Sequence, residues 1–329
     1  MTHMRFSLYL YSFAIMISLS SCKDPSGKME EKSESSWKPD VRYIEGTSGL
    51  LGEGSIWDHE REVLYWVDIQ GKLLHGYDPV HGKHTSLELP STIGTIVPES
   101  HNTVIVALKD GIYRMFLNAD SLVFIAKPAS LKEEERFNDG KCDPQGRLWV
   151  GSMRVKGNPG DSYLYQYDPK EGFSEMIDSV SISNGIIWSQ DSKFMYYIDT
   201  PTRRIMQYDF DLKSGMISNG KIAVEISDTL GHPDGMTIDE EGKLWVGMWG
   251  GHAVCRFDPM NGQLMQRIEV PAKNVTSCAF GGKNLDTLYI TTARLGMNEE
   301  EKKQYPHAGG LFQVVPGVKG IEANFFKPK

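Results

Sequence analysis

Four oxygen-bearing side chains stand in the same local setting along the chain. Glu53, Asp139, Asn184 and Asp234 each directly precede a glycine. Carboxylate and carboxamide oxygens are the ligands that calcium, magnesium and manganese prefer, whereas zinc favours nitrogen and sulfur. If the fold brings these residues together, they predict a site for one divalent cation. Calcium is the first choice, with magnesium, manganese or zinc as alternatives. The competing interpretation is local, because Asp and Asn also cap turns.

The elements that must position these residues recur along the chain. From about residue 41 the sequence consists of short apolar runs broken by Gly, Pro, Asp and Asn, and no long stretch shows a helical apolar period. This pattern is typical of an all-β domain. GRLWVG at residues 146–151 matches GKLWVG at residues 242–247, and a Tyr-Asp-Pro or Phe-Asp-Pro turn recurs at residues 77–79, 167–169 and 257–259. The chain is therefore built from repeated units.

A small residue marks the first strand of each unit. These residues are Gly54, Gly94, Gly140, Gly185, Gly235 and Ser277, at intervals of 40, 46, 45, 50 and 42 residues. Six units of about 45 residues, each with about four strands, predict a six-bladed β-propeller over residues 41–329. We expect the small residue to open the innermost strand of each blade.

The innermost strand of a propeller blade lines the central channel, so equivalent positions converge on one axis. The residues before the small ones are Glu53, Ile93, Asp139, Asn184, Asp234 and Thr276. Carboxylates gathered at one axis repel one another unless a cation neutralises them. The repeat therefore favours a metal site in the channel over isolated turn caps, with coordination positions left open for water and substrate.

Charge and the N-terminal sequence limit the partners and the location. The formal net charge of -8 argues against nucleic acid, because phosphate binding needs a basic face. Residues 1–21 combine a short basic start, an apolar run and small residues before Cys22. This layout predicts a secretory signal peptide. LSSC resembles the lipobox of bacterial lipoproteins, which makes Cys22 the predicted lipidation site. The alternative is an ordinary signal peptide with an incidental cysteine.

The segment after Cys22 is polar and charged. Residues 22–40 are too poor in apolar groups to form a core, so they predict a flexible tether. We therefore expect an exported, membrane-anchored bacterial lipoprotein, periplasmic or on the cell surface. Its contact with the membrane would be through the N-terminal lipid alone.

Four segments together resemble one protein family. RFNDGK at residues 136–141, SNG at 183–185, PDGM at 233–236 and TSCAFGGKN at 276–284 are similar to the senescence-marker-protein/gluconolactonase family, which includes regucalcin. The similarity runs from about residue 52 to residue 320. It implies a propeller with one divalent cation in the channel, held by Glu53, Asn184 and Asp234. It also implies that Arg136 and Asn138 contact substrate.

The usual activity of that family is hydrolysis of sugar lactones to aldonic acids. The resemblance therefore implies a small-molecule sugar lactone as the substrate. Asp234 is the candidate general base, because it stands both at the metal and at the channel mouth, and a metal-bound hydroxide is the alternative base. We place Asp139 outside the principal ligands.

Two other functions remain open from the residues. One is hydrolysis of another ester, such as an organophosphate or aryl ester, at the same metal. The other is a non-catalytic propeller that binds calcium or carbohydrate. The sequence contains no Gly-x-Ser-x-Gly nucleophile elbow, which argues against a serine hydrolase.

Overall fold

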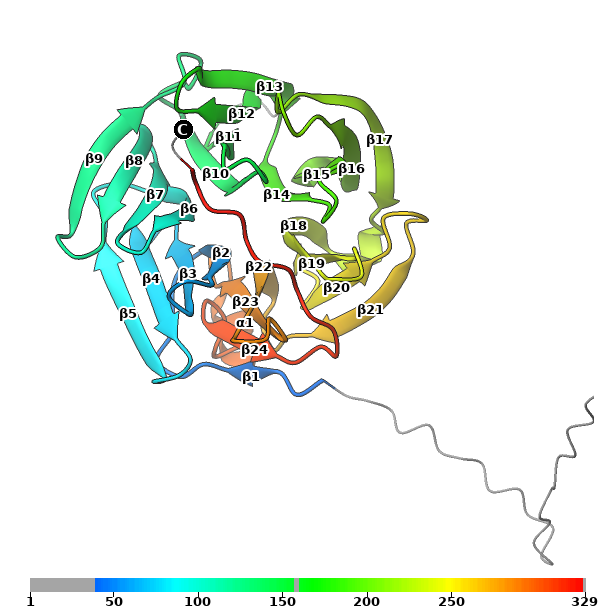
Figure 1. The fold of residues 1–329 in the computed structure, drawn as a ribbon. Helices are drawn as coiled ribbons and strands as arrows, with labels where there is room; N and C mark the ends of the chain where they lie inside the picture. Colours follow the sequence, from blue (N-terminus) through cyan, green and yellow to red (C-terminus); the bar gives the residue numbers. More distant parts are fainter. Residues whose placement is uncertain (1–38, 157–159, 328–329) are drawn as a thin grey trace, which may run out of the picture. The chain divides into compact units, whose positions relative to one another are not determined.

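The strands form six four-stranded antiparallel sheets arranged around one axis (Figure 1). This computed structural model describes residues 39–156 and 160–327. The arrangement confirms the predicted six-bladed β-propeller. The predicted signal peptide, Cys22 and the tether up to residue 38 lie outside the described residues, so those assignments stay predictions. Within the described ranges, no helix has the length and apolar character needed to cross a membrane.

Each blade begins with a strand beside the axis and continues outward. The innermost strands are β2 (Gly52–Asp58), β6 (Ile93–Ser100), β10 (Glu135–Cys142), β14 (Ser183–Trp188), β18 (His232–Ile238) and β22 (Asn274–Gly281). The outer strands of blades 1 to 3 are β3 (Val63–Asp68), β4 (Leu73–Asp78), β5 (Lys83–Glu88), β7 (Thr103–Leu108), β8 (Gly111–Phe116), β9 (Ser121–Ala126), β11 (Leu148–Arg154), β12 (Ser162–Asp168) and β13 (Gly172–Val180). Those of blades 4 to 6 are β15 (Phe194–Asp199), β16 (Arg204–Phe210), β17 (Ile217–Glu225), β19 (Leu244–Trp249), β20 (Ala253–Phe257), β21 (Leu264–Glu269), β23 (Thr287–Ala293), β24 (Leu311–Val314) and β1 (Arg42–Tyr43). Three short helical turns connect strands: η1 (Thr200–Thr202), η2 (Asp228–Leu230) and α1 (Glu299–Gln304).

The first strand of the domain completes the last blade. β1 pairs antiparallel with β24, and Arg42 lies opposite Gln313. Blade 6 thus takes its outermost strand from one end of the domain and its other three strands from the far end. Backbone hydrogen bonds between these distant segments close the ring, a connection that six consecutive sequence units do not predict.

Every innermost strand carries a β-bulge near the small residue that marks the repeat. In β14 the register against β15 shifts between Ser183 and Ile186, and corresponding shifts occur in the other five strands. The expectation that the small residue opens the strand is wrong, because the ladder continues on both sides of the bulge. β10, for example, already begins at Glu135, well before Gly140. Since a bulge bends and twists its strand, it re-aims the neighbouring side chains.

Close approach of the blades explains the glycines at these bulges. A Cβ atom on Gly185 would lie 2.8 Å from the backbone oxygen of Asp234 in the next blade, nearer than real Cβ atoms come. Gly54 has a φ of +58°, in the left-handed region that favours glycine. Neighbouring innermost strands therefore meet at backbone distance, which brings the residues before the glycines toward one axis.

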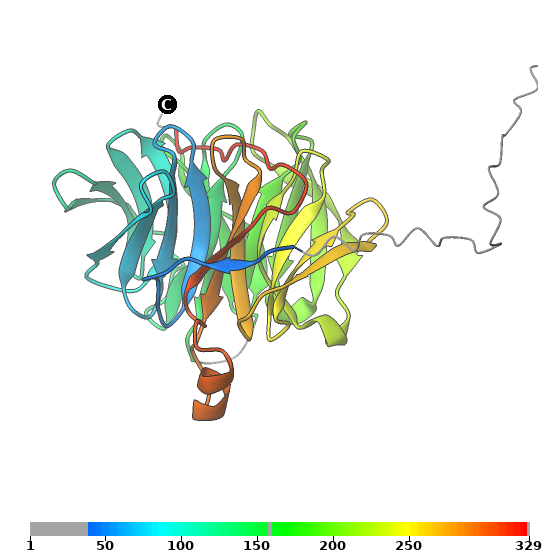
Figure 2. The same cartoon turned by 90° about the horizontal axis from the view of Figure 1, so that it is seen from below.

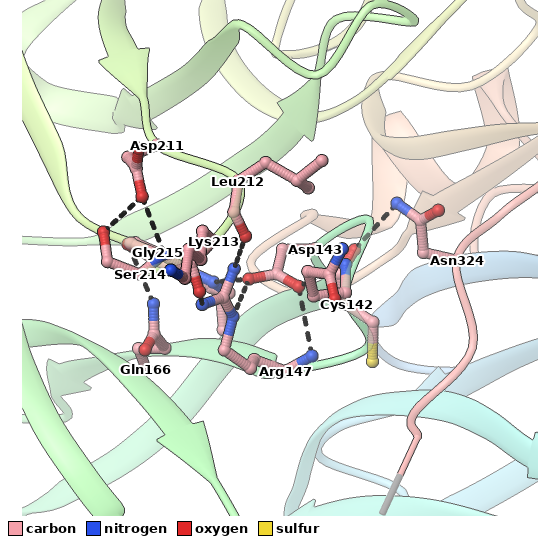
Figure 3. Close-up of polar contacts among 12 residues, drawn as sticks. Cys142, Asp143, Arg147, Gln166, Asp211, Leu212, Lys213, Ser214, Gly215 and Asn324 are labelled. Carbon is pink, nitrogen blue, oxygen red and sulfur yellow. Dashed lines mark hydrogen bonds and ion pairs between the residues drawn. The ribbon is translucent and has the colours of Figure 1, made fainter. Parts of the chain in front are cut away.

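A buried aspartate stabilises the turn that follows an innermost strand by accepting several hydrogen bonds. Asp143 accepts hydrogen bonds from the backbone N–H and Nε of Arg147 and from the Trp149 indole, at 3.1, 2.6 and 3.1 Å. The Arg147 guanidinium also donates to backbone carbonyls in the loop at residues 211–216 of blade 4 (Figure 3). The second LWVG run repeats the contact, since Asp239 accepts from the indole of its tryptophan at 2.9 Å. The repeated sequence therefore reflects a repeated buried hydrogen-bond network.

The C-terminal segment closes one end of the channel. Beyond β24 it crosses the face of the ring opposite α1 (Figures 1 and 2). Asn324 donates from Nδ2 to the carbonyl of Cys142 at 3.2 Å, and the backbone N–H of Phe326 donates to the carbonyl of Pro98 at 2.8 Å. Residues 321–324 and the ends of the innermost strands leave a space of only about 40 Å³ there. A ligand would therefore enter the channel from the α1 end.

Replacing Asp143 with alanine should destabilise the fold by about 3–5 kcal/mol, because it leaves the Arg147 guanidinium buried without its partner. Urea unfolding followed by tryptophan fluorescence measures the change. Asp178→Ala is the matched control on exposed β13, and it should shift the unfolding free energy by less than about 0.5 kcal/mol. Equal unfolding free energies of the two variants would show that the hydrogen bonds of Asp143 do not stabilise the fold.

Candidate functional site

Five residues singled out from the sequence lie around one cavity at the α1 end of the channel. Glu53, Arg136, Asn138, Asn184 and Asp234 line this cavity of about 420 Å³. They belong to β2, β10, β14 and β18, and therefore to four different blades. All five side chains are buried, with relative exposures between 4% and 7%. The geometry brings these residues together, while their chemical roles stay predictions.

A chain of hydrogen bonds orients the amides on one side of the cavity. Arg136 Nη1 donates to Asn138 Oδ1 at 2.6 Å, and Asn138 Nδ2 donates to Asn184 Oδ1 at 3.0 Å. Asn184 Nδ2 donates to the Thr200 hydroxyl at 2.7 Å, which donates in turn to the carbonyl of Pro233 at 2.8 Å. Thr200 therefore fixes which end of the Asn184 amide faces Asn138. The amide oxygen keeps a second lone pair for another ligand.

Two carboxylate oxygens in the cavity have no protein partner among the described residues. Glu53 Oε2 and Asp234 Oδ1 are buried and make no hydrogen bond. Burial raises the pKa of Glu53 to about 8, and the negative charge of Asp139 adds to this. Burial also raises the pKa of Asp234 well above its usual range, with further contributions from Glu53 and Asp139. The protein surroundings alone therefore oppose ionisation of these two carboxyl groups.

One arginine partly balances this charge. Burial lowers the pKa of Arg136 to about 10, and the charges of Glu53 and Asp234 act against that shift. Arg136 is therefore a cation at neutral pH. Its Nη1 is held by Asn138 and by the carbonyl of Phe137, at 2.9 Å from the latter. Among the described residues, only Nη1 of this guanidinium bonds to protein, so its other donors can serve a ligand.

Asp139 acts on the site from outside the cavity wall. Its φ of 49° places it in the left-handed region at the bulge of β10, and its Oδ1 accepts from the N–H of Gly140 at 2.7 Å. Its Oδ2 is buried and unpartnered within the described ranges. Asp139 is not among the residues that line the cavity. Its effect on the site is its negative charge, which raises the pKa of both cavity carboxyls.

The donor set fits a hard divalent cation. Glu53 and Asp234 each offer an unpartnered carboxylate oxygen, and Asn184 offers an oriented amide oxygen. Such oxygen donors suit calcium, magnesium or manganese. In residues 39–156 and 160–327, no group of three or more His, Cys, Asp or Glu side chains is placed to hold a metal ion. The third protein donor would therefore be the Asn184 amide.

Several cavity residues were not found from the sequence. Thr200 lies in η1, and its only signal is its place directly after the second strand of blade 4. The repeat also did not mark the apolar residues of the wall, which are Leu51, Met153, Ile182, Pro201 and Leu295. These residues stand at strand ends and connections, where the blades differ from one another. Trp249 belongs to the same apolar wall, and His232 also lines the cavity.

Comparison with known proteins places the chain in a family. Residues 51–294 match the family model described as SMP-30/gluconolactonase/LRE-like region. A Bacillus subtilis protein named sugar lactone lactonase YvrE is 44% identical over 268 residues, covering 82% of this chain and 92% of that protein. The chain belongs to the SMP-30/gluconolactonase/LRE-like family. The matched region contains all five site residues named from the sequence, so the predicted family membership is confirmed.

Solved structures of the SMP-30/gluconolactonase/LRE-like family share the fold. A calcium-binding regucalcin from Agrobacterium tumefaciens aligns with a TM-score of 0.84 and 28% identity, covering 88% of this chain and 98% of that one. A luciferin-regenerating enzyme aligns with a TM-score of 0.83 and 33% identity, covering 88% of this chain and 99% of that one. The names within the family thus span a lactonase, a calcium-binding protein and another enzyme, so the fold alone does not define the substrate.

Proposed function

We propose that this chain is a divalent-cation-dependent lactonase that hydrolyses a sugar lactone to the corresponding aldonic acid. The observation that carries the proposal is the polar part of the cavity, called the floor below, which consists of Glu53, Arg136, Asn138, Asn184, Thr200 and Asp234. It combines two unpartnered carboxylate oxygens with an oriented amide and a buried arginine. The similarity to the Bacillus sugar lactone lactonase supports the reaction class. The similarity to a calcium-binding regucalcin supports calcium as the cation.

The cation would be held by Glu53, Asn184 and Asp234. When bound, it supplies positive charge that offsets the two carboxylates and polarises the lactone carbonyl. The protein contributes a fixed geometry, because the Asn184 amide is clamped between Asn138 and Thr200. Hydrogen bonds to a side chain that coordinates a metal fix the orientation of that side chain and change its affinity for the metal.

Arg136 would position the substrate. Its guanidinium is held in place through Nη1, and its remaining donors can bond to ring or hydroxyl oxygens of the lactone. A charged, planar donor group binds oxygen pairs with directional hydrogen bonds. Because Arg136 is buried, these bonds form in a setting where water competes poorly.

Asp234 would take the proton from the attacking water. One of its two carboxylate oxygens would hold the cation, and the other would accept that proton. The water oxygen bonds to the carbonyl carbon, and the ring C–O bond then breaks. The released alkoxide takes up the proton that Asp234 removed from the water, and the product is an aldonic acid, which then ionises. Arg136 can stabilise negative charge on oxygen while this occurs.

Replacing Asp234 with asparagine should lower kcat/KM for glucono-δ-lactone by about 10²–10⁴-fold, the usual contribution of a general base. A pH-stat measures acid release, with the spontaneous rate subtracted, and circular dichroism confirms the fold. Asp178→Asn on the exposed face of β13 is the control. Full activity in the Asp234 variant would exclude the proposed base. Failure of the unchanged protein to hydrolyse any aldonolactone, with calcium bound, would instead favour a binding propeller.

Calcium should stabilise the protein through Glu53. At a free concentration of 100 times its Kd, calcium should raise the unfolding free energy by about 2.7 kcal/mol, because it binds the folded state. Urea unfolding with calcium and with EDTA measures the difference. Glu53→Gln should lose this calcium-dependent rise. A variant that keeps the full rise would remove Glu53 from the ligand set.

Thr200→Val should weaken calcium binding by about 10–100-fold while leaving the propeller folded, because the Asn184 amide loses its orienting partner. Isothermal titration calorimetry measures the affinity. Thr200→Ser keeps the hydroxyl and should restore it. If the valine and serine variants bind calcium equally well, the hydroxyl does not position Asn184.

A further inference from the structure

The cavity has a polar floor and an apolar wall. Six of the thirteen residues that line it are apolar: Leu51, Met153, Ile182, Pro201, Trp249 and Leu295. They come from strand ends and connections of different blades. Met153 and Ile182 are joined by an isolated bridge, and the N–H of Leu295 donates to the carbonyl of Leu50 at 3.0 Å. Leu50 and Leu295 remain exposed, at 47% and 39%, so the apolar surface continues outside the cavity.

Most polar side chains of the floor already form hydrogen bonds with one another. Both ends of the Asn138 amide are bonded, to Arg136 on one side and to Asn184 and the Ser183 carbonyl on the other. The Thr200 hydroxyl both accepts and donates. The floor groups left for a substrate are the free Arg136 donors and the cation-binding oxygens. They gather where the lactone carbonyl must lie for the reaction. His232 is a further polar residue of the lining, and its Nε2 lies 3.2 Å from Arg203 Nη2.

We infer that this site takes a deoxy-sugar lactone, in which a methyl group replaces the terminal hydroxymethyl group. The inference rests on the proposed lactonase function. With its carbonyl at the floor, a lactone directs its remote carbon chain along the apolar wall. A hydroxyl group packed against the wall residues other than Trp249 loses hydrogen bonds to water without replacement, whereas a methyl group loses none. The methyl group also gains from leaving water.

The cavity volume is compatible with this substrate class. At about 420 Å³ the cavity lies within the range of ordinary small-molecule sites, and it can hold a six-carbon lactone. An apolar pocket discriminates against an added hydroxyl by roughly a hundredfold at best. We therefore expect a preference of about 10- to 100-fold in kcat/KM for the deoxy compound.

Two matched substrate pairs test this inference. L-rhamnono-γ-lactone and L-mannono-γ-lactone differ only by the hydroxyl group on C6, and so do D-fucono-γ-lactone and D-galactono-γ-lactone. Acid release in a pH-stat, with calcium present and spontaneous hydrolysis subtracted, measures kcat/KM for each compound. The deoxy member should be hydrolysed about tenfold or more faster in at least one pair. Glucono-δ-lactone serves as the separate test of lactonase activity.

A variant of the wall links the preference to its cause. Met153→Gln keeps the length of the side chain but adds a donor and an acceptor, so the deoxy preference should fall about tenfold toward unity. Met153→Leu keeps the wall apolar and should keep the preference. Met265→Gln makes the same change on the outer strand β21, at a residue that is 46% exposed, and should leave the ratio unchanged.

The outcomes separate this inference from the proposed function. Equal or faster hydrolysis of the hydroxylated member in both pairs overturns the inference but leaves the lactonase in place. Hydrolysis of glucono-δ-lactone without hydrolysis of any of the four test compounds has the same meaning. No hydrolysis of any lactone overturns both. A deoxy preference that survives in Met153→Gln removes the wall as its origin.

Discussion

Burial of two neighbouring carboxyl groups, those of Glu53 and Asp234, is the constraint on which the site depends. Each is almost fully removed from water, and the nearby charge of Asp139 makes ionisation of both less favourable. Arg136 opposes this effect but is a single cation. Ionised carboxylates at such a position require further positive charge. This need for positive charge is what would draw a divalent cation into the cavity.

The propeller supplies the rigidity that such a site requires. Bulges and glycines let the innermost strands meet at backbone distance, as the close approach of Gly185 to Asp234 shows. The pairing of β1 with β24 closes the ring, and contacts such as that of Arg147 with the carbonyl of Leu212 tie one blade to the next. Because the strands are held from both sides, the backbone positions that carry the carboxylates are fixed relative to one another.

The polar floor and the apolar wall of the cavity come from two different parts of the fold. The floor comes from equivalent positions of the innermost strands, where Glu53, Asn184 and Asp234 provide oxygen donors. The wall comes from strand ends and connections, which differ between blades and tolerate change more readily. Under the proposed function, the oxygen donors of the floor would serve the reaction, and wall residues such as Met153 and Leu295 would select the substrate.

The sequence by itself determined the number of blades and the phase of their innermost strands, because the repeat is a local pattern of turns, strands and glycines. That phase singled out Glu53, Asp139, Asn184 and Asp234. The family resemblance then reduced the expected ligands to Glu53, Asn184 and Asp234 and added Arg136 and Asn138. Only the tertiary structure decided the pairing of β1 with β24, the C-terminal closure of the channel, the role of Thr200 and the apolar wall. These features join residues that are far apart in the chain and follow no shared period. These residues come close only when the ring closes, so no local sequence pattern predicts their contacts.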